Sequence, residues 1–319
     1  MVPVVPARPE QAESAARLVA ESPGLTRLWQ GQSYGVDTAT TFAYLAGRGL
    51  STALGTCVMI TPLQHPVRAA LEARSLAVIS GAPVMYCVGP GSMSAQRRLA
   101  GAPYGAAVSV TRRYLEDMRS ALRSSDPEAT RAGEEGSSPL FPVPAPEIRL
   151  GAGVLRPAMA RTAGQVADVA VTWMCTAEYI RDQLSPAMES AAAAAGRSRP
   201  HRVAAVHIAV ERPGRDPWVL ARVGVGGHLE LEHYAATARR CGVAVHPGDS
   251  RRTVASAVES GVFVYGSAKA VAQQLRIYAK CGIDEVALNV AAVAACHGTE
   301  QALDDVREIL GEIYADTGR

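Results

Sequence analysis

The stretch GTCVMITPLQHP, residues 55–66, begins as an apolar strand and ends in a loop where His65 precedes a proline. A strand that only filled a core could be aliphatic throughout, yet this one carries Gly55, Thr56 and Cys57 ahead of its apolar end. Small residues inside a strand often mark a bulge or a close approach to the backbone. The stretch therefore predicts a buried strand whose backbone lies against another group.

Apolar runs of this kind recur along the whole chain. They are short and almost continuously apolar, as expected of strands buried on both faces. Helical patterns separate them, and several of these open with Ser, Thr or Pro in the first turn. Eight strands alternating with helices predict a closed parallel (β/α)8 barrel, or TIM barrel, with a doubly wound open sheet as the alternative. The predicted strands are residues 2–6, 27–31, 52–60, 84–89, 147–153, 168–174, 202–210 and 285–290.

Two segments interrupt this rhythm. Residues 124–146 are rich in Pro, Ser, Gly and Glu, which predicts a long, flexible surface loop. Residues 211–262 contain more helical pattern than one crossover needs, so we interpret them as an insertion between strands seven and eight, over one rim of the barrel. A small separate subdomain is the alternative. The whole chain, residues 1–319, is otherwise expected to form one domain.

Composition excludes several classes of protein. With 32 Lys and Arg against 30 Asp and Glu, the charge is too balanced for an electrostatic nucleic-acid binder. No apolar run reaches the about 18 residues of a membrane span, and the N-terminus has no signal-peptide pattern. The six cysteines form no C-x-x-C pair and no zinc-binding pattern with histidine, so we expect no metal site. They are typical of reduced thiols in a cytoplasmic protein.

Glycine-rich turns follow two of the predicted strands. CVGPG, residues 87–91, leaves backbone without side chains at a barrel mouth. GAGVLRP, residues 151–157, leads into a helix, so its backbone N–H groups could face an anion, with Thr176 capping a neighbouring helix. Two well-capped turns with no ligand are the alternative. The candidate cofactor-binding residues in and beside these turns are Gly89, Gly91, Gly151, Ala152, Gly153, Val154, Thr172, Cys175 and Thr176.

A Rossmann dinucleotide site is not indicated. The motif G-x-G-x-x-G is incomplete in GAGVLR, where the sixth position is Arg156.

Four blocks of the sequence, in order, resemble the bacterial luciferase-like oxidoreductases. They are RLWQGQS, ALGTCVMITPLQHPVRAALEARSLAVISGAPVMYCVGPG, EIRLGAGVLRPAMARTAGQVADVAVTW and VYGSAKAVAQQLRIYAKCGIDEVAL. The resemblance extends over nearly the whole chain and implies a (β/α)8 barrel. It also implies a flavin-type cofactor, either the deazaflavin F420 or FMN, across the carboxyl ends of the strands. Members of this family generally form homodimers, here with the helix at residues 66–80 near the interface.

The resemblance also gives a meaning to the opening stretch. In this family the third strand has a bulge beside the cofactor ring, commonly with a cis peptide bond between residues other than proline. The matching residues are Cys57 and Val58. The bulge would place the strand backbone against one face of the ring.

One departure from the family pattern concerns the end of the second strand. Many deazaflavin-dependent relatives have an Asp-His pair there, and the matching residues in this chain are Gln32 and Ser33. They are candidate substrate contacts, but they cannot act as a strong acid or base. Oxidation of an alcohol, which needs such a base, is therefore disfavoured.

Other side chains could supply a proton or line the substrate site. The candidate proton donors are Tyr34, His65 and Tyr104. His228 and His233, in the predicted insertion, could line the substrate mouth. A structural role is the alternative for each of them.

Three functions fit these observations. The first is an F420H2-dependent reductase that transfers a hydride to an electron-poor double bond, such as that of a dehydroamino acid like dehydroalanine in a peptide natural product. Its partner would be a small molecule or a modified peptide. The second is an FMNH2-dependent monooxygenase, which must keep water from its intermediate. The third is a non-catalytic barrel that binds a ligand or a partner.

Overall fold

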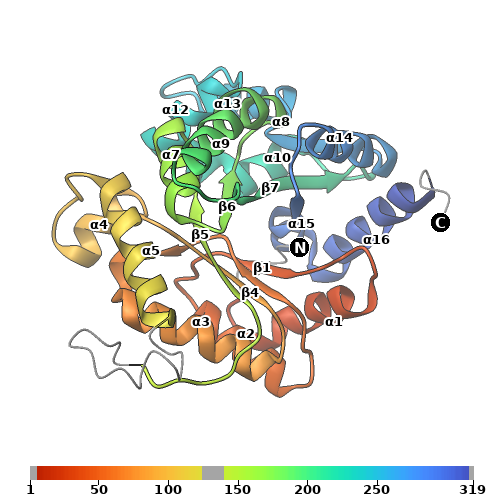
Figure 1. Ribbon diagram of the computed structural model, residues 1–319. Coiled ribbons are helices and arrows are strands. Elements are labelled where there is room, and N and C mark those ends of the chain that lie inside the picture. The colour runs from red at the N-terminus through yellow and green to blue at the C-terminus, as the bar shows by residue number, and fades with distance from the viewer. Residues whose placement is uncertain (1–5, 124–139, 316–319) are drawn as a thin grey trace.

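The computed structural model describes residues 6–123 and 140–315. Within these residues one mostly parallel sheet curves into a nearly closed barrel with helices around it (Figure 1), so the predicted TIM-barrel class is confirmed. The strand order is β1-β2-β4-β5-β6-β7-β8, with β3 beside β4 and β9 beside β7. The strands are β1 (Leu28–Gln30), β2 (Leu54–Thr56), β3 (Met59–Ile60), β4 (Val84–Gly89), β5 (Ile148–Gly153), β6 (Val169–Trp173), β7 (His201–Val210), β8 (Phe263–Gly266) and β9 (Glu285–Asn289).

Helices connect the strands and cover the outside of the barrel. They are α1 (Glu13–Glu21), α2 (Thr38–Gly47), α3 (Pro66–Ser80), α4 (Met93–Ala100), α5 (Ala107–Arg123), α7 (Pro157–Val166), α8 (Ala177–Tyr179), α9 (Ser185–Ala194), α10 (Pro217–Ala221), α11 (Gly227–Leu229), α12 (Glu232–Arg240), α13 (Ser250–Glu259), α14 (Ala268–Lys280), α15 (Ala291–His297) and α16 (Thr299–Ala315). Short 3-10 turns, η1 (Pro9–Ala12) and η2 (Thr61–Leu63), and π-helical turns, η3 (Ile180–Leu184) and η4 (Arg222–Gly226), complete the fold.

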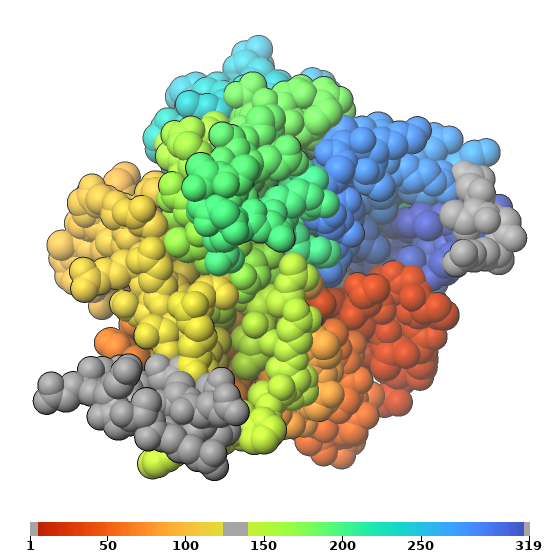
Figure 2. All heavy atoms as spheres, viewed as in Figure 1, coloured from red at the N-terminus to blue at the C-terminus, as the bar shows by residue number. Residues whose placement is uncertain are grey.

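The early and late parts of the chain occupy different sides of the molecule. In Figure 2 the segments coloured red to yellow fill the lower and left part of the face, and those coloured green to blue fill the upper and right part. The two parts meet along the pairing of β4 with β5, and also where α1 packs against α16. No helix of the described residues is long and apolar enough to cross a membrane.

The structure corrects the predicted strands at two places. Residues 52–60 form two short strands, β2 and β3, rather than one. Strand β8 was not predicted; β7 is ten residues long and pairs with β9 over residues 203–207 and with β8 over residues 207–210. A strand of four residues after a helical stretch gives little periodic signal in the sequence. The predicted strand at residues 2–6 lies, except for its last residue, outside the described residues.

Two further predictions concern connecting segments. Of the predicted loop at 124–146, residues 124–139 lie outside the described residues, and residues 140–146 contain no helix or strand. The predicted insertion at 211–262 contains α10, η4, α11, α12 and α13. Whether it is an insertion or a small subdomain stays a prediction.

The inside of the barrel is filled by alternate side chains of the strands. Trp29 is fully buried there, and a Cβ atom on Gly55 would collide with its indole ring. A Cβ atom on Gly151 would likewise collide with the Cys87 sulfur. The interior cluster comprises Trp29, Cys57, Met85, Cys87, Val169, Val171, Val203, Ala205 and Ala287, and a larger cluster joins the outer face of the strands to the helices. The barrel is therefore a packed core and has no open channel at this level.

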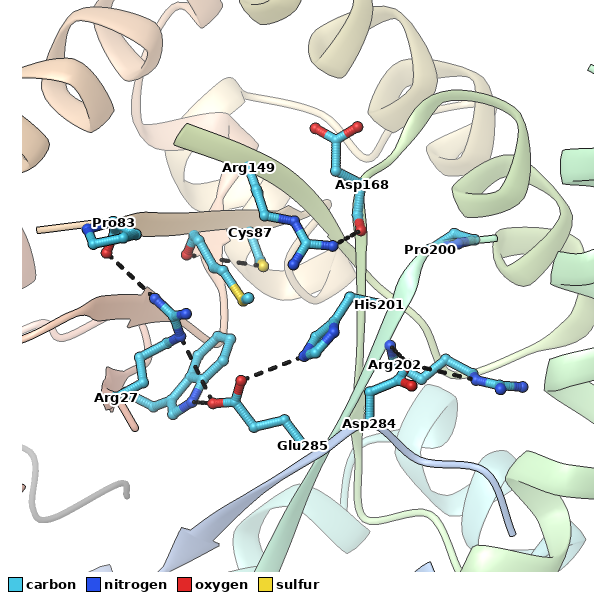
Figure 3. Close-up of polar contacts among 12 residues, drawn as sticks. Arg27, Pro83, Cys87, Arg149, Asp168, Pro200, His201, Arg202, Asp284 and Glu285 are labelled. Atoms are coloured by element: carbon cyan, nitrogen blue, oxygen red, sulfur yellow. Dashed lines mark hydrogen bonds and ion pairs between the residues drawn. The ribbon is translucent and has the colours of Figure 1, made fainter. Parts of the chain in front are cut away.

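Glu285 lies at the amino end of this core and joins the first described strand to the last (Figure 3). The Trp29 indole nitrogen donates to Glu285 Oε1 at 2.6 Å, His201 Nε2 lies 3.4 Å from Oε2, and Arg27 Nε lies 3.7 Å from Oε1. Burial alone would raise the pKa of Glu285. The His201 contact, the Arg27 charge and the indole N–H outweigh this effect, so the pKa of Glu285 is lowered below the ordinary 4.5. Glu285 is thus ionised and bridges β1 and β9.

The Trp29 contact can be tested by replacing Trp29 with Phe, which keeps a ring in the core but removes the indole N–H. We expect the free energy of unfolding to fall by about 1.5–3 kcal/mol for a hydrogen bond to a charged group, with a further loss from the smaller ring. Urea denaturation at pH 7 measures this. Trp218→Phe is the matched control, because the Trp218 indole nitrogen has no partner in the described chain. Equal losses in the two variants would contradict the assignment.

Candidate active site

The peptide bond between Cys57 and Val58 is cis, as predicted, and it interrupts the third predicted strand at the barrel mouth. Backbone hydrogen bonds tie this bulge to the end of β1: the Cys57 N–H donates to Gln30 O and the Gln32 N–H donates to Val58 O, each at 3.0 Å. The bulge is therefore fixed by the strand beside it.

The Val58 side chain lies across the carboxyl ends of two further strands. A Cβ atom on Gly89 would be 3.0 Å from Val58 Cγ2, and one on Gly153 would be 3.3 Å from Val58 Cγ1. Gly89 ends β4 and Gly153 ends β5. A Cβ atom at either position would crowd the Val58 methyl groups, so glycine leaves room for Val58 there. The result is a small apolar platform at the mouth, directly above the filled interior.

Gln32 and Ser33 lie beside this platform, but their polar atoms already have partners in the chain. Gln32 donates from Nε2 to the Ser33 carbonyl at 2.9 Å, and its Oε1 accepts from the Ile60 N–H at 3.5 Å. Ser33 is buried, and its hydroxyl accepts from the Gly35 N–H at 3.2 Å. Both side chains therefore hold the loop after β1, and neither presents a base.

The predicted anion site in GAGV is corrected by the structure. Residues 151–153 belong to β5 and pair with β4 and β6, and the Val154 N–H donates to Val171 O at 2.7 Å. Ala152 and Val154 pack in the outer core, and the Thr172 hydroxyl donates to Val203 O at 3.2 Å. A glycine at the end of a strand and a glycine in a turn look the same in sequence, which explains the error. The backbone N–H groups free to face an anion would therefore follow Val154, and the anion site itself stays a prediction.

The loops after β5 and β6, which were expected to converge, contact each other beyond Val154. The Tyr179 hydroxyl donates to Leu155 O at 3.1 Å, and Arg156 Nη2 donates to His233 O at 3.2 Å. Thr176 caps α8 as predicted, because its side chain accepts from the Tyr179 N–H. Arg156, at the N-cap of α7, supplies a positive charge at this rim. In the sequence, Arg156 stood out only as the residue that breaks the motif G-x-G-x-x-G, which gives no sign of a cation at this rim.

Trp173 ends β6 at the mouth, and the chain turns sharply after it. Met174 has φ 55°, a left-handed conformation that is uncommon outside glycine and clusters at functional sites. Cys175 is buried; its thiol donates to Trp173 O at 3.4 Å, and its carbonyl accepts from the Tyr278 hydroxyl at 3.0 Å. Cys175 thus fixes the turn instead of presenting its sulfur to a ligand.

A chain of aromatic rings runs from Trp173 into residues 211–262. Trp173 contacts His207 and His228 edge to face, with ring centroids 4.9 and 5.7 Å apart. His228 and His233 both contact Tyr234, at 4.9 and 4.2 Å. The two predicted histidines are therefore close together, and His228 reaches the mouth.

His207 was missed by the sequence analysis. It lies in β7 within the apolar run RVAAVHIAV and is only 2 % exposed. Burial, with a smaller contribution from His228, lowers its pKa to about 3, so it is neutral at pH 7. A single histidine in a buried strand was the only signal, and it could equally mark an ordinary core residue.

The three predicted proton donors differ in their surroundings. His65 is exposed and caps α3, with Nδ1 accepting from the Val67 N–H at 3.3 Å. Tyr34 is 69 % exposed. The Tyr104 hydroxyl lies 3.3 Å from the Thr61 hydroxyl, just beyond the end of β3. Of the three, only Tyr104 is held near the bulge by a side-chain contact.

The mouth combines an apolar surface with a nearby cation. The Val58 platform is apolar and bordered by glycines, and Arg156 provides a cation where the loops after β5 and β6 meet. Gly91 has φ 69° and lies against Ile60 beside the same bulge. Among the residues the structure describes, no cluster of His, Cys, Asp or Glu could hold a metal ion.

The family of the chain follows from a sequence comparison. The model of the luciferase-like monooxygenase family matches residues 5–285, and the chain belongs to this family. The expected resemblance and the expectation of an oxidoreductase are thereby confirmed. No curated protein sequence matches the chain.

Solved structures share the fold at low sequence identity. An F420-dependent secondary alcohol dehydrogenase in complex with an F420-acetone adduct is 16 % identical, with a TM-score of 0.73 over 96 % of this chain and 95 % of that one. A coenzyme F420-dependent tetrahydromethanopterin reductase from Methanopyrus kandleri is 18 % identical, with a TM-score of 0.70 over 98 % and 97 %. The oxygenating constituent of 3,6-diketocamphane monooxygenase from Pseudomonas putida, with FMN, is 15 % identical, with a TM-score of 0.65 over 96 % and 93 %.

The buried state of His207 can be tested by titration. Because its folded pKa of about 3 lies below the ordinary 6.5, His207 contributes stability that is fully present above about pH 6.5 and is lost as the pH falls toward 3. We expect its imidazole NMR signals to stay constant between pH 8 and 5. His207→Gln should reduce the decline of the unfolding free energy between pH 6.5 and 3. A titration midpoint near 6.5 would contradict this assignment.

Proposed function

We propose that the chain is an F420H2-dependent reductase that transfers a hydride to an electron-poor double bond. The observation that carries this proposal is the lack of an acid/base pair at the end of β1, where Gln32 and Ser33 bond within their own loop. Oxidation of an alcohol needs a base to take the hydroxyl proton, whereas reduction of an activated alkene needs only orientation and a later proton. The site geometry therefore favours reduction.

Different residues of the mouth would bind the cofactor and orient it toward the substrate. Val58 would support one face of the cofactor ring, and Arg156 would attract its phosphate through charge-assisted hydrogen bonds. Tyr104, beside the bulge, is the candidate that could hold a proton near the substrate. When bound, reduced F420 supplies the hydride.

The comparisons support F420 ahead of FMN to a limited extent. Two of the similar structures are named as F420-dependent, and a third is named in complex with FMN. An electron-poor alkene in a small molecule or a modified peptide, such as a dehydroamino acid, is the acceptor we favour. An FMNH2-dependent monooxygenase is the alternative outcome of the following test.

The cofactor site can be tested by titrating the protein separately with F420 and FMN and following fluorescence quenching. We expect tight binding of F420 and at least tenfold weaker binding by Gly153→Leu, because the new side chain would displace Val58. Gly311→Leu is the matched control, because Gly311 is exposed and its Cβ position is open. Tight binding of FMN alone would favour the monooxygenase, and unchanged binding by Gly153→Leu would place the cofactor elsewhere.

A homodimer is proposed on the outer side of α3. Val78 and Ile79, at the end of this helix, are 44 % and 51 % exposed, and Phe141 is 84 % exposed. Arg74 Nη1 donates to the Phe141 carbonyl at 2.6 Å, which holds Phe141 beside the helix. Exposed apolar side chains gathered in this way are typical of an interface between subunits.

The oligomeric state can be measured by light scattering at micromolar concentration. We expect twice the mass of one chain for the wild-type protein and a shift toward the monomer for Ile79→Glu, which would bury a charge in the interface. Leu99→Glu, on α4, is the control, since Leu99 is also partly exposed but lies away from this surface. A monomeric wild-type protein would refute the proposal.

A further inference from the structure

Two adjacent side chains at the barrel mouth have buried polar atoms with no partner in the described part of the chain. These atoms are the indole nitrogen of Trp173 and both ring nitrogens of His207. Trp173 ends β6, where it pairs with Ala205 of β7, two residues before His207. Buried polar groups in native proteins nearly always have a hydrogen-bond partner. Three such atoms on two rings in contact therefore point to a ligand group that supplies the partner.

The surroundings of these atoms are uncharged. His207 lies against Trp173 and stacks on Phe263, with ring centroids 6.3 Å apart. A Cβ atom on Gly224 of η4 would be 3.3 Å from His207 Nδ1. The titratable group that acts on His207 is His228, whose pKa burial also lowers. No Lys, Arg, Asp or Glu of residues 6–123 or 140–315 bonds to either ring. A charged ligand group would thus find no counter-ion here.

We propose that Trp173 and His207 form a hydrogen-bonding subsite for a neutral carbonyl group of the hydride acceptor, such as a carboxamide conjugated to the reacting double bond. The indole N–H can only donate, so it fits a carbonyl oxygen. A neutral imidazole carries one donor and one acceptor, so it fits either that oxygen or an adjacent amide N–H. This inference rests on the proposed reductase function and specifies the class of its substrate.

The subsite would serve the reaction by stabilising charge on the carbonyl oxygen. The hydride, whose bond to the reduced cofactor breaks, forms a new C–H bond at the β-carbon of the alkene. The π electron pair moves toward the carbonyl and gives an enolate, and the indole N–H donates to its oxygen. A proton from solvent then bonds to the α-carbon. The acceptor gains a hydride and a proton, which together are two electrons and two protons, and the cofactor is oxidised by two electrons. Hydrogen-bond donors that point at an oxygen on which negative charge develops lower the activation free energy of the reaction.

The turn η4 covers the His207 side of the subsite. The backbone of η4 closes over His207 because residue 224 is glycine, and a larger residue would press on the imidazole. The neighbouring Val223 is 45 % exposed, so η4 lies at the surface. The turn η4 therefore lies between His207 and the surface, and the strands are not part of this cover.

The subsite can be tested without turnover, by NMR of the protein labelled with 15N in its indole groups. The sequence has three tryptophans, so three indole signals are expected. The probes are N-acetyl-dehydroalanine methylamide and, as a charged match, N-acetyl-dehydroalanine with its free carboxylate. We expect the amide to shift the Trp173 signal downfield and to leave the Trp29 and Trp218 signals in place. The carboxylate should bind at least tenfold more weakly.

Two substitutions distinguish the loss of the subsite from general effects of replacing a tryptophan. Trp173→Phe keeps the ring but removes the donor, and it should weaken binding of the amide about tenfold, the typical effect of one hydrogen bond in a site. Trp218→Phe is the control, because its indole nitrogen is also without a partner in the described chain, and within the described residues Trp218 has no ring contact with Trp173 or His207. It should bind the amide as the wild type does. If Trp173→Phe does not fold, the shift of the Trp173 indole signal in the wild-type protein still tests whether the amide binds at the subsite.

The outcomes distinguish this inference from the proposed function. Equal binding of the amide and the carboxylate, or an unmoved Trp173 signal at saturation, would refute the subsite even if the protein binds F420. Failure of the protein to bind F420 would refute the reductase function, while the indole signal would still report on the carbonyl subsite. A shifted Trp173 signal together with F420 binding would support both.

Discussion

The barrel depends on one buried contact, the hydrogen bond from the Trp29 indole to Glu285. Among the described residues no backbone ladder joins β1 to β9, so this side-chain contact links the first and last strands. The indole also occupies the space that Gly55 leaves open. Arg27 and His201 keep the carboxylate charged, and a charged acceptor makes a stronger bond than a neutral one. The Trp29 side chain therefore both fills the core and links β1 to β9.

The same relation between glycine and a neighbouring side chain shapes the mouth. Inside the barrel, Gly151 makes room for the Cys87 sulfur. Two residues further along the same strand, Gly153 makes room for Val58. Because side chains in a strand alternate between two faces, both glycines face the interior. The position of the apolar platform is thus a consequence of how the core below it is packed.

Periodic features of the fold could be predicted from the sequence, and local hydrogen bonding could not. The long apolar runs predicted β4 and β7, and resemblance to a family located the bulge at Cys57 and Val58. The sequence could not tell that the Val154 N–H is used by the sheet, because a strand end and a free turn have the same composition. His207 was overlooked for a similar reason: its unpartnered nitrogens are a property of its neighbours in space.

The filled interior also determines how ligands can come and go. With Trp29 and its neighbours packed inside the barrel, a ligand at the carboxyl ends of the strands cannot pass through to the other end. Two molecules that must touch each other there have to approach from the same side. The one that lies deeper cannot depart while the other covers it. Binding and release would then follow a fixed order, with the last molecule to arrive being the first to leave.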